Sequence, residues 1–108
     1  WIYFIMERKA TLVTNIFTLC LSEKKEVFSF GESDCGSHGH ETIKITIPTK
    51  IATLRNIQFI DAGDLHSVCL DYDRNVFTFG SNKYGQLGVC VDPDTLESTH
   101  IPQKVNLP

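Results

Sequence analysis

Three residues whose side chains bind metals lie close together in one short segment. Cys35, His38 and His40 follow the spacing Cys-x-x-His-x-His. Thiolate and imidazole are preferred ligands of Zn²⁺, which takes about four ligands in a structural site. This segment offers three ligands in a tight loop, and Gly36 and Gly39 within it indicate a turn. We therefore expect an ordinary loop here, with no metal and no cofactor.

A histidine and a serine lie side by side at positions 66 and 67, which raises the question of a nucleophile with its general base. Neighbouring residues of a β-strand point to opposite faces of the sheet, so His66 and Ser67 cannot form a hydrogen-bonded dyad on a strand. We expect His66 to be a structural residue that bonds a neighbouring strand. No catalytic residue is assigned, and the chain is not expected to be an enzyme.

Three carboxylates, Asp92, Asp94 and Glu97, lie within six residues of each other beside Pro93. Calcium takes six or more oxygen ligands, and these three could begin such a site. We favour a solvated loop with a turn at the Pro-Asp pair. Because insertions on one face of a repeat scaffold often carry its function, we interpret this loop as a contact for a protein partner.

The bulk composition is ordinary for a globular domain, with 42% hydrophobic and 21% charged residues among 108. The formal net charge is -3, and no run of Lys and Arg exceeds two residues. A nucleic-acid surface needs clustered positive charge, so we expect none here. The apolar opening, residues 1–6, is far shorter than the roughly 20 residues of a membrane helix. We expect a buried strand or the edge of a longer chain, and no membrane contact.

The four cysteines, at positions 20, 35, 69 and 90, form no Cys-x-x-Cys pair. We therefore expect reduced thiols and a cytoplasmic or nuclear location.

The residues discussed so far are positioned by a repeat of 49 residues. Residues 27–31, Val-Phe-Ser-Phe-Gly, return as residues 76–80, Val-Phe-Thr-Phe-Gly. Other positions that recur at this interval are Cys20 and Cys69, Gly36 and Gly85, and Gly39 and Gly88. Residues 47–51 then return as residues 101–105, an interval of 54, because the second copy has five extra residues. One such repeat cannot bury its own apolar face, so the copies must pack on one another.

Short strands are predicted throughout, and the fold class is all-β. Two apolar runs joined by a polar turn predict a hairpin at 17–30 and another at 67–79. Residues 43–47 alternate Ile with Lys and Thr, which indicates a strand with one wet face. Pro48 ends that strand or marks it as an edge strand. Residues 57–62 form a further predicted strand, and no sustained 3.6-residue apolar period predicts a helix.

Glycines follow the aromatic strands at fixed distances, which is typical of turns. They do not form a phosphate-binding loop, because the Lys-Ser/Thr of a P-loop and the Gly-x-Gly-x-x-Gly spacing are both absent. The positions that we assign a structural role in the repeat are Gly31, Gly36, Gly39, Gly63, His66, Gly80, Gly85 and Gly88.

The second copy resembles the repeat of the regulator of chromosome condensation family. The resemblance lies in residues 62–70, Ala-Gly-Asp-Leu-His-Ser-Val-Cys-Leu, and 76–88, Val-Phe-Thr-Phe-Gly-Ser-Asn-Lys-Tyr-Gly-Gln-Leu-Gly. The first copy keeps the glycines but has Ser37 and His38 in place of Gln and Leu. The hairpin turns of the first and second copies have Lys25 and Arg74, respectively, where the family usually has Gly. If these residues adopt a left-handed φ, each costs roughly 1 kcal/mol.

The resemblance covers about residues 10–108 and implies antiparallel β-propeller blades, about two of the roughly seven that close a ring in the family. The chain is then a fragment of a larger ring. It comprises a partial first repeat at 1–47 with the apolar N-terminal segment, a second repeat at 48–101 with an enlarged loop at 89–100, and the start of a third repeat at 102–108.

The function that the resemblance implies is that of a non-catalytic protein-interaction scaffold. Its partners would be another protein and the remaining blades of the same chain. Two alternatives stay open: part of a guanine-nucleotide exchange factor for a Ran-like small GTPase, and the propeller domain of a larger ubiquitin ligase or adaptor protein.

Overall fold

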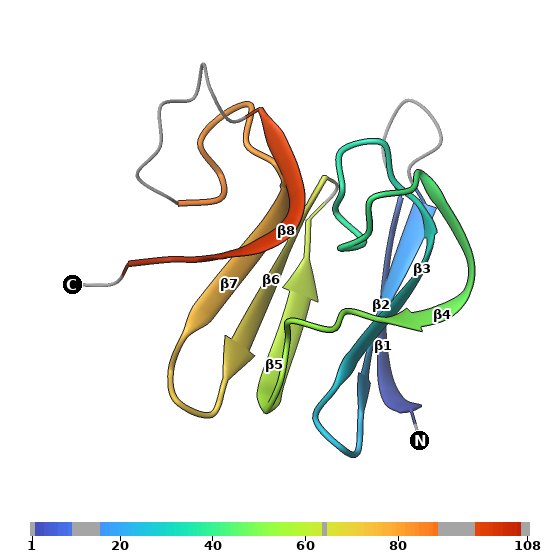
Figure 1. Cartoon of the computed structure of the whole chain (residues 1–108), viewed down its shortest axis with the longest axis vertical. Coiled ribbons are helices and arrows are strands. Elements are labelled where there is room, and N and C mark those ends of the chain that lie inside the picture. Colours follow the sequence, from blue (N-terminus) through green and yellow to red (C-terminus); the bar gives the residue numbers. More distant parts are fainter. Residues whose placement is uncertain (1, 10–15, 64, 89–96, 107–108) are drawn as a thin grey trace.

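The computed structural model describes residues 2–9, 16–63, 65–88 and 97–106. It contains two four-stranded antiparallel sheets (Figure 1). The first sheet comprises β1 (Ile2–Lys9), β2 (Ile16–Ser22), β3 (Val27–Glu32) and β4 (Lys44–Lys50). The second comprises β5 (Ile57–Ala62), β6 (His66–Asp71), β7 (Val76–Ser81) and β8 (Ser98–Lys104). Strand order equals chain order in both, which confirms the all-β prediction.

The two sheets share one internal register. Thr18 pairs with Phe30 in the first sheet, and Ser67 pairs with Phe79 in the second. Thr18 and Ser67 are 49 residues apart in sequence, and so are Phe30 and Phe79. Each repeated residue therefore occupies the same place in its sheet. The repeat in sequence is therefore a repeat in structure. The expected repeat boundaries, after residues 47 and 101, fall inside β4 and β8, so the sequence unit is offset from the sheet.

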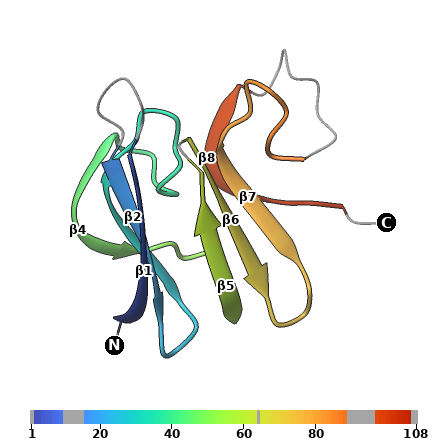
Figure 2. The same ribbon diagram turned by 180° about the vertical axis from the view of Figure 1, so that it is seen from behind.

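The apolar core lies between the two sheets, where β5 packs against β1 and β2. Figures 1 and 2 show the second sheet facing the first from either side. The buried cluster draws on both sheets and on the segment that connects them: Phe17, Leu19, Leu21, Val27, Ile51, Leu54, Ile57, Ile60, Ala62, Cys69 and Phe79. Full burial of a large apolar side chain contributes roughly 1.5–3 kcal/mol. This shared core fixes the two sheets against each other.

Each sheet has a second face that no described residue of the other sheet covers. Phe79 is fully buried between the sheets, whereas Phe30, at the equivalent position of the first sheet, is only half-buried. On the second sheet Val68, Leu70 and Val76 are half-buried as well. Partly exposed apolar side chains on an outer face are expected of a repeat unit that packs against a neighbour on each of its two faces.

The outer strand β4 differs from its prediction. One face of the strand was expected to be dry, but Ile43 just before it and Ile47 within it are 61% and 69% exposed. The prediction was wrong at these two positions because β4 is an edge strand in the described part of the chain, and of the three isoleucines only Ile45 is half-buried. Pro48 lies within β4, as a proline can on an edge strand. No helix in the described part of the chain is long and apolar enough to cross a membrane.

Both hairpin turns contain a non-glycine residue in the left-handed region. The φ of Lys25 is 65° and that of Arg74 is 68°. Their amides donate to Ser22 O at 2.9 Å and to Asp71 O at 3.3 Å. Both turns therefore adopt the left-handed φ without glycine, and each residue costs roughly 1 kcal/mol relative to Gly.

We predict that Arg74→Gly raises the free energy of unfolding by about 1 kcal/mol, because Gly adopts positive φ without strain. Lys25→Gly gains less, because the Lys25 ammonium lies 5.7 Å from the centre of the Tyr72 ring and that cation–π contact is lost. The control is Lys24→Gly, at a neighbouring turn position without positive φ, which should cost roughly 0.4–1 kcal/mol. Urea denaturation measures all three. Equal effects at positions 24 and 74 would contradict the strain argument.

We also predict that the isolated 108-residue chain self-associates. Its edge strands and its half-buried apolar faces offer surfaces for other chains. Sedimentation equilibrium should show dimers or larger species. A monomer that melts in one sharp cooperative transition would show that two sheets suffice.

Candidate functional site

The long loops of both sheets gather at one end of the molecule. Loop 33–43 joins β3 to β4, and loop 82–88 follows β7 (Figure 1). Both views place these loops at the same end and the tight hairpin turns at the other (Figure 2). We call residues 33–43, 82–88 and 97–100 the loop rim. Loops held by a rigid strand scaffold are the usual place for binding residues.

Loop 33–43 is tied together by its own polar groups. The Ser33 hydroxyl accepts from the Ser37 amide at 2.9 Å and lies 2.6 Å from the Ser37 hydroxyl. The amide of Gly39 donates to Gly36 O at 2.9 Å. From β3, the Ser29 hydroxyl donates to His38 O. The loop is therefore a compact turn with a defined shape.

Loop 82–88 repeats this design with different side chains. The Thr78 hydroxyl of β7 donates to Leu87 O at 2.7 Å, as Ser29 does to His38 O. Leu87 and His38 are both fully buried. His38 therefore occupies the position of an apolar side chain in the other copy.

Loop 33–43 also fastens the first sheet to the second. The Ser67 hydroxyl donates to Ser37 O at 2.6 Å. The Cys35 thiol donates to Leu65 O at 3.3 Å. A Cβ on Gly36 would lie 2.7 Å from both Cα and N of His100 in β8, so the two backbones approach as closely as Gly permits.

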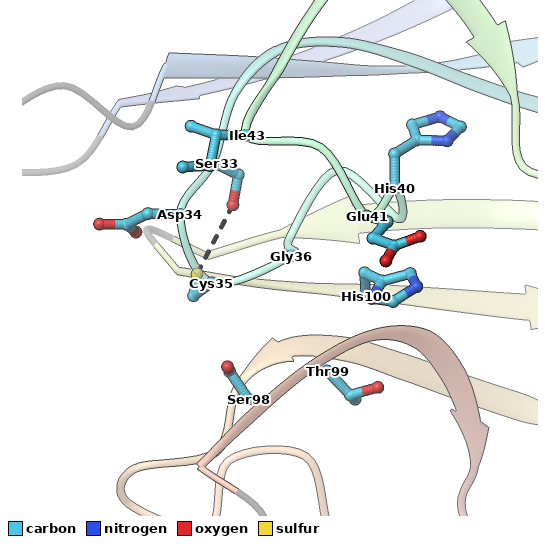
Figure 3. Close-up of a pocket in the computed structure, with 10 residues that line it drawn as sticks. All are labelled: Ser33, Asp34, Cys35, Gly36, His40, Glu41, Ile43, Ser98, Thr99 and His100. Atoms are coloured by element: carbon cyan, nitrogen blue, oxygen red, sulfur yellow. Dashed lines mark hydrogen bonds between the residues drawn. The ribbon is translucent and has the colours of Figure 1, made fainter.

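A pocket of about 140 Å³ lies at this junction (Figure 3). Its lining residues are Ser33, Asp34, Cys35, Gly36, His40, Glu41, Ile43, Ser98, Thr99 and His100. Figure 3 shows Glu41 beside His100. Glu41 belongs to loop 33–43 of the first sheet, and His100 belongs to β8 of the second sheet. Small-molecule pockets usually have about 300–1,000 Å³, so this one fits a single side chain of a partner better than a whole cofactor.

The three residues with metal-binding side chains have separate partners. His38 Nε2 bonds Ile43 O at 3.0 Å, and His40 Nε2 bonds Thr49 O at 3.2 Å. The Cys35 thiol is directed to the backbone of the second sheet instead. Within the ranges described, no three His, Cys, Asp or Glu side chains are grouped to hold a metal ion.

His66 and Ser67 also diverge. The Ser67 hydroxyl is engaged with Ser37 O, on the face toward the first sheet. The His66 ring packs on Gly63, where an added Cβ would lie 2.5 Å from ring atom Cε1. The Gly63 amide donates to His66 O at 2.8 Å. This geometry supports the structural role that we propose for both residues.

Of the remaining glycines of the proposed set, Gly31 and Gly80 lie within β3 and β7 at register shifts, and the other four lie in the loops of the rim. Six glycines have positive φ: Gly31 (111°), Gly36 (84°), Gly39 (78°), Gly80 (111°), Gly85 (73°) and Gly88 (67°). Of the acidic loop, Asp92 and Asp94 lie outside the described residues. Glu97 is exposed, and its carbonyl accepts from the Asn82 amide at 2.7 Å. The last acidic residue of that loop, Glu97, therefore lies beside loop 82–88.

Some features of the rim have no signal in the sequence. Residues 98–100 join the pocket only because β8 approaches loop 33–43 across the sheets. No spacing relates the two segments, since the 49-residue interval is lost before residue 98. Tyr84 is 83% exposed at the tip of its loop, although its aromatic side chain alone suggests burial.

The second half of the chain matches a known repeat. Residues 57–86 and residues 73–108 each match the regulator of chromosome condensation (RCC1) repeat. The human E3 ubiquitin-protein ligase HERC2 is 37% identical over 82 residues, which cover 73% of this chain and 2% of the ligase. The human regulator of chromosome condensation is 28% identical over 120 residues, which cover 95% of this chain and 28% of that protein.

A solved structure has the same fold. Prp20p from Saccharomyces cerevisiae, whose binding to Gsp1p and histones has been studied, superposes with a TM-score of 0.81 at 26% identity. The match covers 99% of this chain and 24% of Prp20p. The two sheets are thus blades of an RCC1-like propeller, and the chain spans less than a third of each of these proteins.

We predict that Gly36→Ala is far more destabilising than Gly85→Ala. Both glycines have positive φ, so either alanine costs about 1–2 kcal/mol of strain. Only the Cβ at position 36 meets backbone, at 2.7 Å, while at position 85 nothing lies within 4 Å. Overpacking should therefore add roughly 1–3 kcal/mol at position 36 alone. Urea denaturation measures the free energy of unfolding of the two variants. Equal losses of stability would show that β8 moves away from position 36 without cost and would contradict the prediction.

Proposed function

The chain belongs to the family of regulator of chromosome condensation (RCC1) repeat proteins, and we propose that it is a non-catalytic protein-interaction scaffold. Its blades hold the loop rim in place, and a partner protein binds across the rim. The proposal rests above all on the exposed Tyr84 and the polar pocket at the same end of the molecule. A protruding aromatic ring near a small polar pocket is suited to recognition of a protein surface.

The relatives favour a scaffold over any one activity. HERC2 is named as a ligase and the human relative as a regulator of chromosome condensation, yet both share these repeats. A structural unit shared by proteins of different activity supplies a surface, while function lies in the site grafted on it. We also propose that the repeats divide the chain after residues 47 and 101, and that the protein acts in the cytoplasm or nucleus.

The enlarged loop 89–100 is the proposed partner loop, with Asp92, Asp94 and Glu97 as its acidic residues. Glu41 and Asp34 line the pocket of the same rim. These carboxylates would favour a partner with basic side chains at its contact surface, because complementary charge raises the association rate.

Two narrower functions follow from particular relatives. Similarity to the human regulator of chromosome condensation and to Prp20p favours a part in a guanine-nucleotide exchange factor for a Ran-like small GTPase. A nucleotide-release assay with the full-length protein tests the exchange function, and an unchanged rate of nucleotide release from the GTPase rules that function out.

Similarity to HERC2 favours a propeller domain within a larger ubiquitin ligase or adaptor. Ubiquitin transfer by the full-length protein is the corresponding assay.

We predict that a partner is captured from the rim and not from the opposite end. A photo-crosslinking amino acid at position 84 of the full-length protein should give discrete protein adducts in cells. Tyr72 is the matched control, because it is 54% exposed in the hairpin turn at the other end of the same sheet. Adducts of equal strength from both positions, or from position 72 alone, would contradict binding at the rim.

A further inference from the structure

His38 is held in one protonation state by the backbone around it. Its side chain is fully buried, and His40 N donates to Nδ1 at 3.3 Å. Nε2 lies 3.0 Å from Ile43 O. An amide can only donate and a carbonyl can only accept, so Nδ1 must be without a proton and Nε2 must carry one. Loop 33–43 thus closes around a neutral imidazole.

A second proton on His38 would disturb the hydrogen bonds around the ring. It would place an N–H group at Nδ1 against the N–H group of His40, which removes one hydrogen bond and leaves a buried charge. Two neighbouring imidazoles, those of His40 and His100, add to this cost. The His40 ring centre lies 5.7 Å away in the same loop, and His100 acts on the site from β8.

The other elements that touch the loop contribute neutral hydroxyls. Ser29 of β3 donates to His38 O, and Ser67 of β6 donates to Ser37 O. Burial is the largest cause that lowers the pKa of His38, followed by the positive charge that His40 and His100 acquire in acid. The backbone hydrogen bonds of the ring to Ile43 and Thr42 raise the pKa, but they are outweighed.

We propose that loop 33–43 is an acid-sensitive connection between the two sheets. The loop is closed while His38 is neutral, and it opens when Nδ1 takes up a proton. Opening would release the contacts that the loop makes across the sheets, namely the Ser67–Ser37 and Cys35–Leu65 hydrogen bonds. It would also dismantle one wall of the rim pocket. This inference goes beyond the scaffold function and does not depend on the identity of the partner.

The direction of the pH effect follows from the lowered pKa. In the open loop His38 titrates near its ordinary value of about 6.5, whereas in the closed loop its pKa is lower. Above pH 6.5 both states are neutral and the closed state keeps its full stability. As the pH falls below about 6.5 the open state binds the extra proton, and each unit multiplies its population by up to tenfold. The effect levels off below the closed-state pKa.

The second copy supplies an internal control. Leu87 fills the position of His38, with the same hydroxyl bond to its carbonyl, and it cannot titrate. Loop 82–88 should therefore stay closed over the pH range in which loop 33–43 opens.

The test is amide hydrogen exchange of the full-length protein at about pH 7.5 and 5.0, corrected for the intrinsic exchange rate, with mass spectrometry of peptides from both loops. We expect up to about thirtyfold greater opening at the lower pH in 33–43 and no change in 82–88. His38→Leu should abolish the response, and His40→Asn, which keeps the backbone donor, should retain it. An equal acid response of both loops overturns the proposal. So does an acid response of loop 33–43 that persists in His38→Leu, or one that is lost in His40→Asn but not in His38→Leu.

A second measurement needs no variant and so does not depend on the folding of His38→Leu. Exchange of the imidazole C2 proton reports the pKa of each histidine in the unchanged protein. The proposal requires a pKa for His38 below its ordinary value of about 6.5. A value at or above 6.5 would overturn it.

Discussion

The structure depends on one constraint: each sheet can bury an apolar face only against another sheet. Phe17 and Leu19 of the first sheet meet Phe79 and Ile60 of the second, and all four are at most 1% exposed. The residues equivalent to Phe17, Leu19 and Phe79 in the other copy, which are His66, Val68 and Phe30, stay half-buried. Stability in such an array is a sum of contacts between neighbours, so the position of the loop rim is set by packing between sheets and not within one sheet.

That constraint explains what could be predicted from the sequence. The strands and hairpin turns follow local rules of alternation and turn chemistry, and the left-handed φ of Lys25 and Arg74 follows from their place in the hairpins. The exposure of Ile47 and the pocket beside His100 depend on which strand is an edge and on how β8 meets loop 33–43. Such contacts between distant segments leave no pattern in a single sequence.

The two copies also show how a scaffold keeps its frame while its loops diverge. Ser29 and Thr78 differ in side chain but make the same bond to the carbonyl of a buried residue in the following loop. The buried residue itself differs, as His38 in one copy and Leu87 in the other. The hydroxyl preserves the path of the backbone, so the loop can exchange an apolar anchor for a titratable one without a change of fold.

The offset between sequence unit and sheet has an evolutionary consequence. Because the proposed boundaries after residues 47 and 101 fall inside β4 and β8, deletion of residues 48–101 would join Ile47 to Pro102. The junction reads Lys-Ile-Thr-Ile-Pro-Gln-Lys, a complete outer strand with its proline in place. Unequal recombination could thus change the number of units in a gene while every surviving sheet retains four strands.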